Sequence, residues 1–455
     1  MATTRIAFLA LITLACSLPA WSEASAAPGV NDVVAELNQA SYRGILEDLL
    51  ETHAGDNRGF VWSSSQNAYY PSAGHDIARD NILSWFSGLG LDASLAPFTF
   101  GSYVGCNNVL GVLPGHINPQ AVYIIGGHYD SVGNPGADDN ASGVAGVMEA
   151  ARILANMPLA CTVIFVAWDG EEEGLKGSYH WVNTQDESVV DGVVNLDMIA
   201  YNHNGTNNAT VYGSAAWRAK WVAAATAYAP DIKIIEYTSN LSGSDHWPFQ
   251  SASRPAGGII EAYPLPNPNY HKQSDSVDTL NYIDYDYAMK LLASGVGLLL
   301  QEADLLLPGD TDNDKDVDYA DYINLVSHFG MTTGAQWSTG DFNADGQVDA
   351  FDYIALNQNY GDTLAHQIPA TVPEPASMLI LAAAGLLALA RPKLKMHRQR
   401  PALWSAATSL RRSAAAALDR ARTSQPAHVR AKAAWASFQD LTPHSKGFAF
   451  SRRLS

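Results

Sequence analysis

The residues best suited to chemistry follow an apolar run in the first half of the chain. The run AVYIIG at 121–126 leads into GHYDSVGNPGADDNASG, which contains one histidine and three aspartates: His128, Asp130, Asp138 and Asp139. Such groups are costly to place at the end of a buried strand unless a charge neutralises them. A hydrogen-bonded turn is the alternative interpretation, because Asp, Asn, Gly and Ser are common turn residues.

Four further polar clusters occur along the chain. One follows the apolar run TVIFVAWDG, and the others lie in NLDMIAY, SGSDHWPF and PNPNYHKQSD; their residues are Glu171, Glu172, Glu173, Asp197, Asp245, His246 and His271. Each cluster alone is compatible with a solvated surface or a hydrogen-bonded histidine. Together they supply imidazoles and carboxylates at successive strand ends, a suitable set for one or two Zn²⁺ ions.

Strand and helix patterns alternate around these clusters. From 107 to about 215, apolar runs such as NVLGVLPG and VVNLDMIAY alternate with helical patterns such as GVAGVMEAARILANM. This alternation predicts an α/β domain with a mixed, largely parallel sheet covered by helices on both faces. Ligand sites in such sheets form beyond the carboxyl ends of the strands. Helical stretches also precede this region within 31–95, and a final helix is expected to end near Ala303.

The ordered series HYDS, GADDNASG, EEEGLKGS, NLDM, SDHWPF and YH resembles the di-zinc aminopeptidases of the bacterial leucyl aminopeptidase type, metallopeptidase family 28. The resemblance covers about 31–304 and implies the zinc exopeptidase fold with two Zn²⁺ ions. Carried over by position, it implies that His128 and Asp197 bind one zinc and that Glu172 and His271 bind the other. Asp139, which directly precedes the N-A-S-G segment, would bridge both ions.

The same resemblance assigns roles to residues around the metals. Glu171 matches the general base, which takes the proton of the attacking water and passes it to the leaving amine. Tyr270 is a candidate oxyanion donor. Asp130 would hold the second nitrogen of the His128 imidazole. Glu173 is expected to face solvent, and Asp245 and His246 are expected to line the pocket without binding metal.

The leading interpretation is therefore a secreted zinc exopeptidase that removes N-terminal residues from peptides. Three alternatives remain open from the sequence. A glutaminyl cyclase shares the fold but performs intramolecular acyl transfer with one zinc, and a carboxypeptidase would use the same metals on the other peptide end. The third is a non-catalytic binding protein that serves a partner contact, although no ligand position is lost.

Two acidic loops after residue 307 predict a calcium module across 308–362. The loops are 31 residues apart, and each places oxygen ligands at the spacing that Ca²⁺ requires. Loop 1 contains Asp310, Asp312, Asp314, Asp316, Asp318 and Asp321, and loop 2 contains Asp341, Asn343, Asp345, Gln347, Asp349 and Asp352. Gly346 provides the tight turn in loop 2, whereas loop 1 has Lys315 there. The duplicated loop and helix resemble a dockerin, which implies two Ca²⁺ ions and a cohesin-type protein partner.

The chain ends carry export signals. Residues 1–26 combine Arg5, an apolar run and the small residues A-S-A, which predicts a secretory signal peptide. Near the other end, V-P-E-P, an apolar run at 376–390 and Arg391 resemble a PEP-CTERM sorting signal across 372–400. Such a signal implies transient membrane anchoring of an exported bacterial protein in the periplasm, on the cell surface or outside the cell. Here 55 residues follow the basic cluster, a departure from that pattern; they form a basic tail at 401–455 with no assigned role.

Charge and cysteine content limit the partners. The formal net charge is −19, which argues against nucleic acid. The 65 residues from 391 contain 14 Lys or Arg and two acidic residues, so the rest of the chain has a net charge of 13 − 44 = −31. This asymmetry indicates that the basic tail is separate from the folded part of the chain. The peptidase domain is expected at 27–304. Its two cysteines, Cys106 and Cys161, would both remain after export, and the sequence leaves their pairing open.

Overall fold

The computed structural model describes residues 29–364 except 186, 240 and 265, and all statements below concern this part of the chain. The predicted signal peptide, the sorting segment and the basic tail lie outside the described residues. Among those described, no helix is both long enough and apolar enough to cross a membrane. Cys106 and Cys161 are both free thiols.

The first helical stretch is divided into two helices, α2 (Val30–Ala35) and α3 (Gln39–Asp48). The division occurs at Asn38, whose backbone is extended and whose side-chain oxygen caps α3 by accepting the N–H of Ser41 at 3.0 Å. The second stretch forms α4 (Ala73–Gly88) as expected. Between them lies an antiparallel hairpin of β1 (Phe60–Ser63) and β2 (Ala68–Pro71), which the sequence patterns did not predict.

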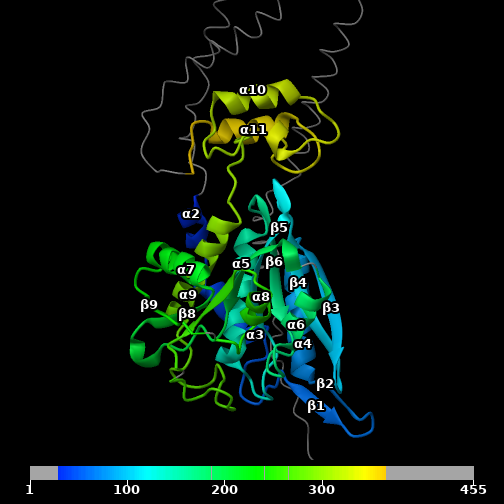
Figure 1. Ribbon diagram of the computed structural model, residues 1–455, viewed down its shortest axis with the longest axis vertical. Coiled ribbons are helices and arrows are strands. Elements are labelled where there is room, and N and C mark those ends of the chain that lie inside the picture. The colour runs from blue at the N-terminus through cyan, green and yellow to red at the C-terminus, as the bar shows by residue number, and fades with distance from the viewer. Residues whose placement is uncertain (1–28, 186, 240, 265, 365–455) are drawn as a thin grey trace, which may run out of the picture. The chain divides into compact units, whose positions relative to one another are not determined.

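A mixed ten-stranded sheet forms the framework of the domain, in the order β1-β2-β4-β6-β5-β7-β10-β8-β9, with β3 paired to β4 (Figure 1). The remaining strands are β3 (Asp92–Phe100), β4 (Tyr103–Leu113), β5 (Asn118–His128), β6 (Cys161–Trp168), β7 (Val190–Leu196), β8 (Asn208–Gly213), β9 (Lys233–Glu236) and β10 (Ala256–Glu261). The central strands β6, β5, β7 and β10 run parallel to one another. Their carboxyl ends therefore meet at one edge, as predicted.

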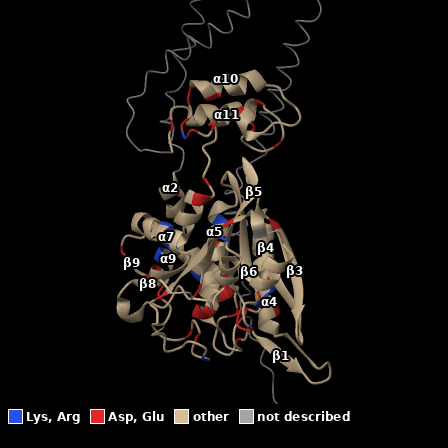
Figure 2. Cartoon of the chain, in the orientation of Figure 1, with Lys and Arg blue, Asp and Glu red and all other residues tan. Residues whose placement is uncertain are grey.

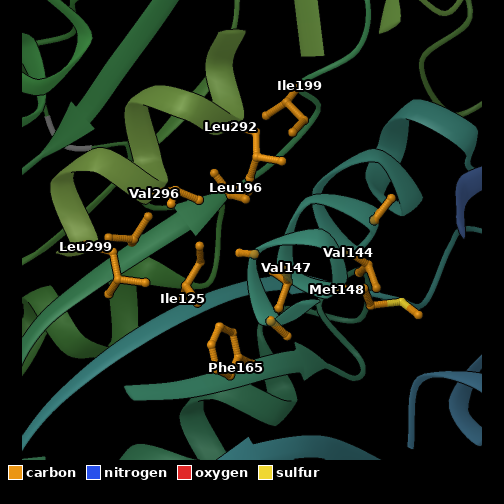
Figure 3. Close-up of a cluster of buried hydrophobic side chains, with 14 of the residues drawn as sticks. Ile125, Val144, Val147, Met148, Phe165, Leu196, Ile199, Leu292, Val296 and Leu299 are labelled. Atoms are coloured by element: carbon orange, nitrogen blue, oxygen red, sulfur yellow. The ribbon is translucent and has the colours of Figure 1, made fainter. Parts of the chain in front are cut away.

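Helices cover both faces of this sheet, which confirms the predicted fold class. One face packs mainly against α3, α4, α5 (Gly143–Leu154), α7 (Ala215–Tyr228) and α9 (Tyr285–Glu302), and the other packs against α6 (Lys176–Thr184) and α8 (His246–Ser251). Figure 3 shows the larger core, where Ile125 of β5 and Leu196 of β7 meet Val147 of α5 and Val296 of α9. Ile124, the neighbour of Ile125, belongs to the core on the opposite face, which also contains Phe249. Burial on both faces explains why these strands read as continuous apolar runs.

The segment after α9 forms the predicted pair of loops and helices. Its helices are α10 (Tyr319–His328) and α11 (Ala350–Asn359), each of which begins directly after an acidic loop. A separate apolar cluster holds them, with Val317, Leu325, Trp337 and Leu356 among its buried members. Figure 2 shows acidic residues in these loops and in the loops at the carboxyl edge of the sheet.

Candidate metal centre

The five predicted zinc ligands all lie at or beyond the carboxyl ends of parallel strands. His128 is the last residue of β5, and Asp197 follows the last residue of β7. Glu172 lies in the turn after β6, and His271 lies in the long segment after β10. Asp139 occupies a single turn at Ala137–Ser142, immediately before α5. Residues that are up to 143 positions apart in the sequence therefore meet at one edge of the sheet.

Asp139 lies between two histidines. Its Oδ1 atom is 3.3 Å from Nε2 of His128, and its Oδ2 atom is 3.1 Å from Nε2 of His271. On one side, His128 Nε2 is 3.7 Å from Oδ1 of Asp197. On the other side, His271 Nε2 is 3.3 Å from Oε2 of Glu172. The site thus consists of two groups of three ligand-type side chains that share one carboxylate, and within each group the ligand atoms lie within 4.8 Å of one another.

These separations fit a zinc coordination shell. Zinc–ligand bonds of about 2.0–2.1 Å in a tetrahedron place neighbouring ligand atoms about 3.3 Å apart, close to the observed 3.1–3.7 Å. In addition, Asp139 Oδ2 and Glu172 Oε1 are buried and make no hydrogen bond to any described residue. Buried carboxylate oxygens without a donor are costly. The short contact between His271 and Asp139 therefore fits two ligands that face a common ion.

The pKa values show how strongly this cluster favours positive charge. Contacts with Asp139 and Glu172 raise the pKa of His271 to about 10. Burial lowers the pKa of His128, but Glu171 and the surrounding carboxylates outweigh it and raise that pKa well above its ordinary value. Burial raises the pKa of Asp139, but the two imidazoles lower it to about 2. A metal ion would have to displace protons from both histidines in order to bind.

Asp130 links the histidine to the glutamate turn. Its Oδ1 atom is 3.5 Å from Nδ1 of His128, as the resemblance implied, although its backbone carbonyl is closer at 3.2 Å. The same carboxylate accepts the backbone N–H groups of Glu171 and Glu172, both at 3.1 Å. Asp130 therefore contacts three predicted site residues at once, whereas the sequence indicated only its contact with His128.

Glu171 faces the metal ligands without being the nearest of them. Its Oε2 atom is 3.9 Å from Nε2 of His128, and the side chain is largely buried at 11% exposure. Burial raises the pKa of Glu171 well above its ordinary value, with further increases from Asp245 and Asp197. Burial likewise raises the pKa of Glu172, to about 7. Glu171 is therefore a buried carboxylate that lies beside the candidate metal ligands, a position suited to a general base.

Three residues that sequence reasoning missed support the ligands from behind. Asn140 accepts the N–H groups of Gly143 and Met198 and donates to the carbonyl of Leu196, so it ties the start of α5 to the end of β7. Ser244 donates to Asp197 at 2.5 Å. Asp275 accepts the backbone N–H of Asp139 at 3.1 Å. The signal for Asn140 was its place directly after Asp139. Ser244 and Asp275 lie within the motifs SGSDHWPF and PNPNYHKQSD, which were selected for other residues.

The remaining predicted residues occupy different environments. Tyr270 is 38% exposed, and its ring stacks on His271 with centroids 3.8 Å apart. Glu173 is exposed, as expected, and accepts the hydroxyl of Tyr103 at 2.7 Å. Asp245 and His246 are almost fully buried, with Asp245 bonded to Ser178. Their expected place in the wall of the pocket stays a prediction.

The two acidic loops have matching backbone geometry. Asp310 accepts two backbone N–H groups within loop 1 at 2.6 and 2.9 Å, and Asp341 does the same in loop 2 at 3.2 and 2.9 Å. Lys315 adopts φ 78°, the same value as Gly346. Its ammonium group lies 2.6 Å from Asp304. The lysine therefore makes the turn for which glycine was expected.

The last aspartate of each loop closes it in the same way. Asp321 accepts two backbone N–H groups at 2.7 and 2.8 Å, and Asp352 accepts the two equivalent ones, both at 2.9 Å. In loop 1, Asp310, Asp312 and Asp321 bring carboxylate oxygens within 4.8 Å of one another, and so do Asp316, Asp318 and Asp321. Clustered oxygen ligands of this kind suit a hard cation such as Ca²⁺.

The edge of the parallel sheet thus carries two histidine–carboxylate groups joined by one aspartate, a set of side chains that could hold two metal ions. Residues 108–296 match the family model described as Peptidase family M28. All five predicted zinc ligands fall within the matched residues.

Relatives in other organisms are consistent with this family. A probable zinc metalloprotease of Pyrenophora tritici-repentis is 26% identical over 330 residues, which cover 60% of this chain and 66% of that protein. Aminopeptidase YwaD of Bacillus subtilis is 31% identical over 202 residues, covering 42% of this chain and 44% of that protein. The chain thus spans less than two thirds of the length of these relatives.

The crystal structure of the Legionella pneumophila LapA aminopeptidase shares the fold. It superposes with a TM-score of 0.51 at 21% identity, and the match covers 61% of this chain and 75% of that chain. At this level of identity the likeness concerns the arrangement of the sheet and its helices.

Proposed function

We propose that this protein is a secreted zinc exopeptidase that removes N-terminal residues from peptides. The observation that carries the proposal is the position of Asp139, whose two carboxylate oxygens lie 3.3 and 3.1 Å from the imidazoles of His128 and His271. Asp197 and Glu172 complete the two groups. Two zinc ions held there would polarise the scissile carbonyl and lower the pKa of the attacking water.

The residues of the chain supply the proton transfers and the orientation. Glu171, which faces His128, takes a proton from the attacking water and delivers it to the amine that leaves. Tyr270, stacked on the half-exposed His271, offers a hydroxyl to the carbonyl oxygen as negative charge develops there. Asp130 holds the turn of the two glutamates, so the base keeps its position during both transfers.

The preference for the amino end of the peptide rests on the resemblance of the motifs and on relatives named aminopeptidases. The test uses the purified full-length chain, its zinc content, and four peptides: one free at both ends, one N-acetylated, one C-amidated and one with N-terminal glutamine. An aminopeptidase releases the first residue of the free and C-amidated peptides and spares the N-acetylated one, with two zinc ions per chain. Release of the last residue would indicate a carboxypeptidase, and loss of ammonia from the glutamine peptide would indicate a cyclase.

We further propose that residues 308–362 form a dockerin-like module that binds two Ca²⁺ ions. The matching closure of both loops by Asp321 and Asp352 supports this. A cohesin-type domain is the proposed partner, and export with transient membrane anchoring is the proposed route. Calorimetric titration of the full-length chain with Ca²⁺ tests the module, and fractionation of expressing cells tests the export. An intact full-length polypeptide that is entirely soluble outside the cell would contradict the anchoring.

A further inference from the structure

We propose that Arg58 is a positioning residue of the metal centre: its guanidinium holds both ends of the loop 129–136, which separates His128 from Asp139. The inference rests on the proposed zinc site. Arg58 lies outside the residues that match the peptidase family model, and no motif in the sequence marked it. Its side chain is fully buried.

The guanidinium group spans the loop from its first residue to its last. Nε donates to the carbonyl of Tyr129 at 2.7 Å, directly after the ligand His128. Nη2 donates to the carbonyl of Gly136 at 2.8 Å, and Nη1 donates to that of Pro135, close before the ligand Asp139. A planar group with donors on separate sides can hold two backbone segments in a fixed relation, which a single ammonium group cannot do.

The remaining contacts of Arg58 fix the clamp to the rest of the domain. Nη1 also donates to the carbonyl of Leu50 at 3.3 Å, after the end of α3. The backbone N–H of Arg58 donates to the Ser131 hydroxyl at 3.2 Å, and its carbonyl accepts the N–H of Ser131 at 3.3 Å. Every hydrogen bond that the side chain donates ends on a backbone carbonyl, so the contacts set the path of the chain.

The loop end that Arg58 holds has a constrained backbone. Gly136 has φ 57°, and a Cβ atom there would lie 2.4 Å from the carbonyl oxygen of Asp139 and 2.8 Å from Nη2 of Arg58. The carbonyl of Gly136 also accepts the N–H of Ala141 at 3.0 Å, inside the turn that carries Asp139. A shift of the guanidinium would therefore move the bridging ligand directly.

The charge of Arg58 suits the surroundings. Burial lowers the pKa of Arg58 and outweighs the opposite effect of Asp275, Asp130, Asp139 and Glu172, so that the pKa is about 10. The guanidinium therefore stays charged at neutral pH and offsets part of the negative charge of the buried carboxylates. A lysine at this position would also offset the negative charge, but it could not hold both ends of the loop. Comparison of lysine with arginine therefore separates the effect of the charge from that of the hydrogen bonds.

The test compares Arg58→Lys, Arg58→Met and a matched control, Arg218→Lys, in the full-length chain. Arg218 is also buried and donates to a backbone carbonyl, that of Gly213, in a part of the domain that carries no metal ligand. Zinc content is measured in chelator-buffered zinc, and thermal midpoints are measured with and without zinc. Both Arg58 variants should need about 10–100-fold more free zinc for half-loading, because residues that orient metal ligands have effects of this size. Arg218→Lys should bind zinc like the wild type.

A clamp and a purely structural role give different results. If Arg58 positions the ligands, the rise in thermal midpoint that zinc produces should shrink in both Arg58 variants. Equal falls of the zinc-free and zinc-loaded midpoints, with zinc affinity unchanged, would overturn the inference. If neither Arg58 variant folds, the test uses Ser131→Ala, which loosens the same loop without touching a ligand. This variant should weaken zinc binding, and unchanged zinc binding would also overturn the inference. A wild-type chain that binds no zinc would overturn the proposed function and this inference together, whereas a zinc-loaded active wild type with unaffected Arg58 variants overturns only the inference.

Discussion

Replacement of Glu171 by glutamine should abolish most of the catalysis and leave the metals in place. The amide keeps the volume of the side chain and can still accept a hydrogen bond, but it cannot take a proton from water. General-base contributions are about 10²–10⁴-fold in rate, which corresponds to about 2.7–5.5 kcal/mol in activation free energy. Because Glu171 Oε2 is 3.9 Å from His128, farther than either Asp139 or Asp197, its loss should not remove a ligand.

Glu172→Gln should behave differently. Its Oε2 atom is 3.3 Å from His271, and together with Asp139 it forms the second group of ligands. A neutral amide in that place weakens zinc binding, so activity should fall with the zinc content and recover in part at high zinc concentration. Glu173→Gln is the matched control, because this exposed residue contacts Tyr103 instead of the ligands. It should keep its zinc and its rate.

The assay measures zinc per chain and the rate of release of the first residue from a peptide for all three variants. A Glu171→Gln protein that loses a zinc ion would show that Glu171 is a ligand and that the two roles are reversed. A Glu171→Gln protein with almost full activity would show that the base lies elsewhere. Either result would refute the reasoning from these distances.

Three further predictions concern other parts of the chain. Tyr270→Phe should lower kcat by about 10²–10³-fold at unchanged zinc content, if its hydroxyl stabilises the oxyanion; an unchanged kcat would remove it from the mechanism. Burial raises the pKa of Glu261 to about 11, so the folded state keeps a proton that the unfolded state loses above about pH 4.5. The free energy of unfolding should therefore fall as pH rises, by up to about 1.4 kcal/mol per unit, and urea unfolding of Glu261→Gln at several pH values should show a flatter profile. An unchanged slope would mean that Glu261 is ionised in the folded protein. Asp321→Asn and Asp352→Asn should each remove one of two Ca²⁺ ions in a calorimetric titration without changing the peptidase rate; calcium binding unaffected by both would contradict the module.

The sequence by itself was sufficient to predict the class of the fold and to select the ligand-type residues that meet at one edge of the sheet. The ligand-type residues follow apolar runs. Such runs can be recognised in a sequence because strands that are buried on both faces consist mostly of apolar residues. A largely parallel sheet brings the carboxyl ends of its strands together as a general property of the fold, so the order of the motifs alone places His128, Glu172 and Asp197 at one edge. The sequence also predicts the two acidic loops, because the candidate ligands of each loop lie within twelve residues of one another.

Only the tertiary structure showed how the ligands are held. Arg58 lies 70 residues before His128, and Asp275 lies 136 residues after Asp139, yet both contact the backbone of the metal-binding loop. The hairpin of β1 and β2 and the position of β5 between β6 and β7 are also long-range facts. Residue types and local spacing describe what a segment can do, but hydrogen bonds between a side chain and a distant carbonyl leave no pattern in the sequence, because every residue offers a carbonyl. The partners of a buried arginine are therefore decided by packing alone.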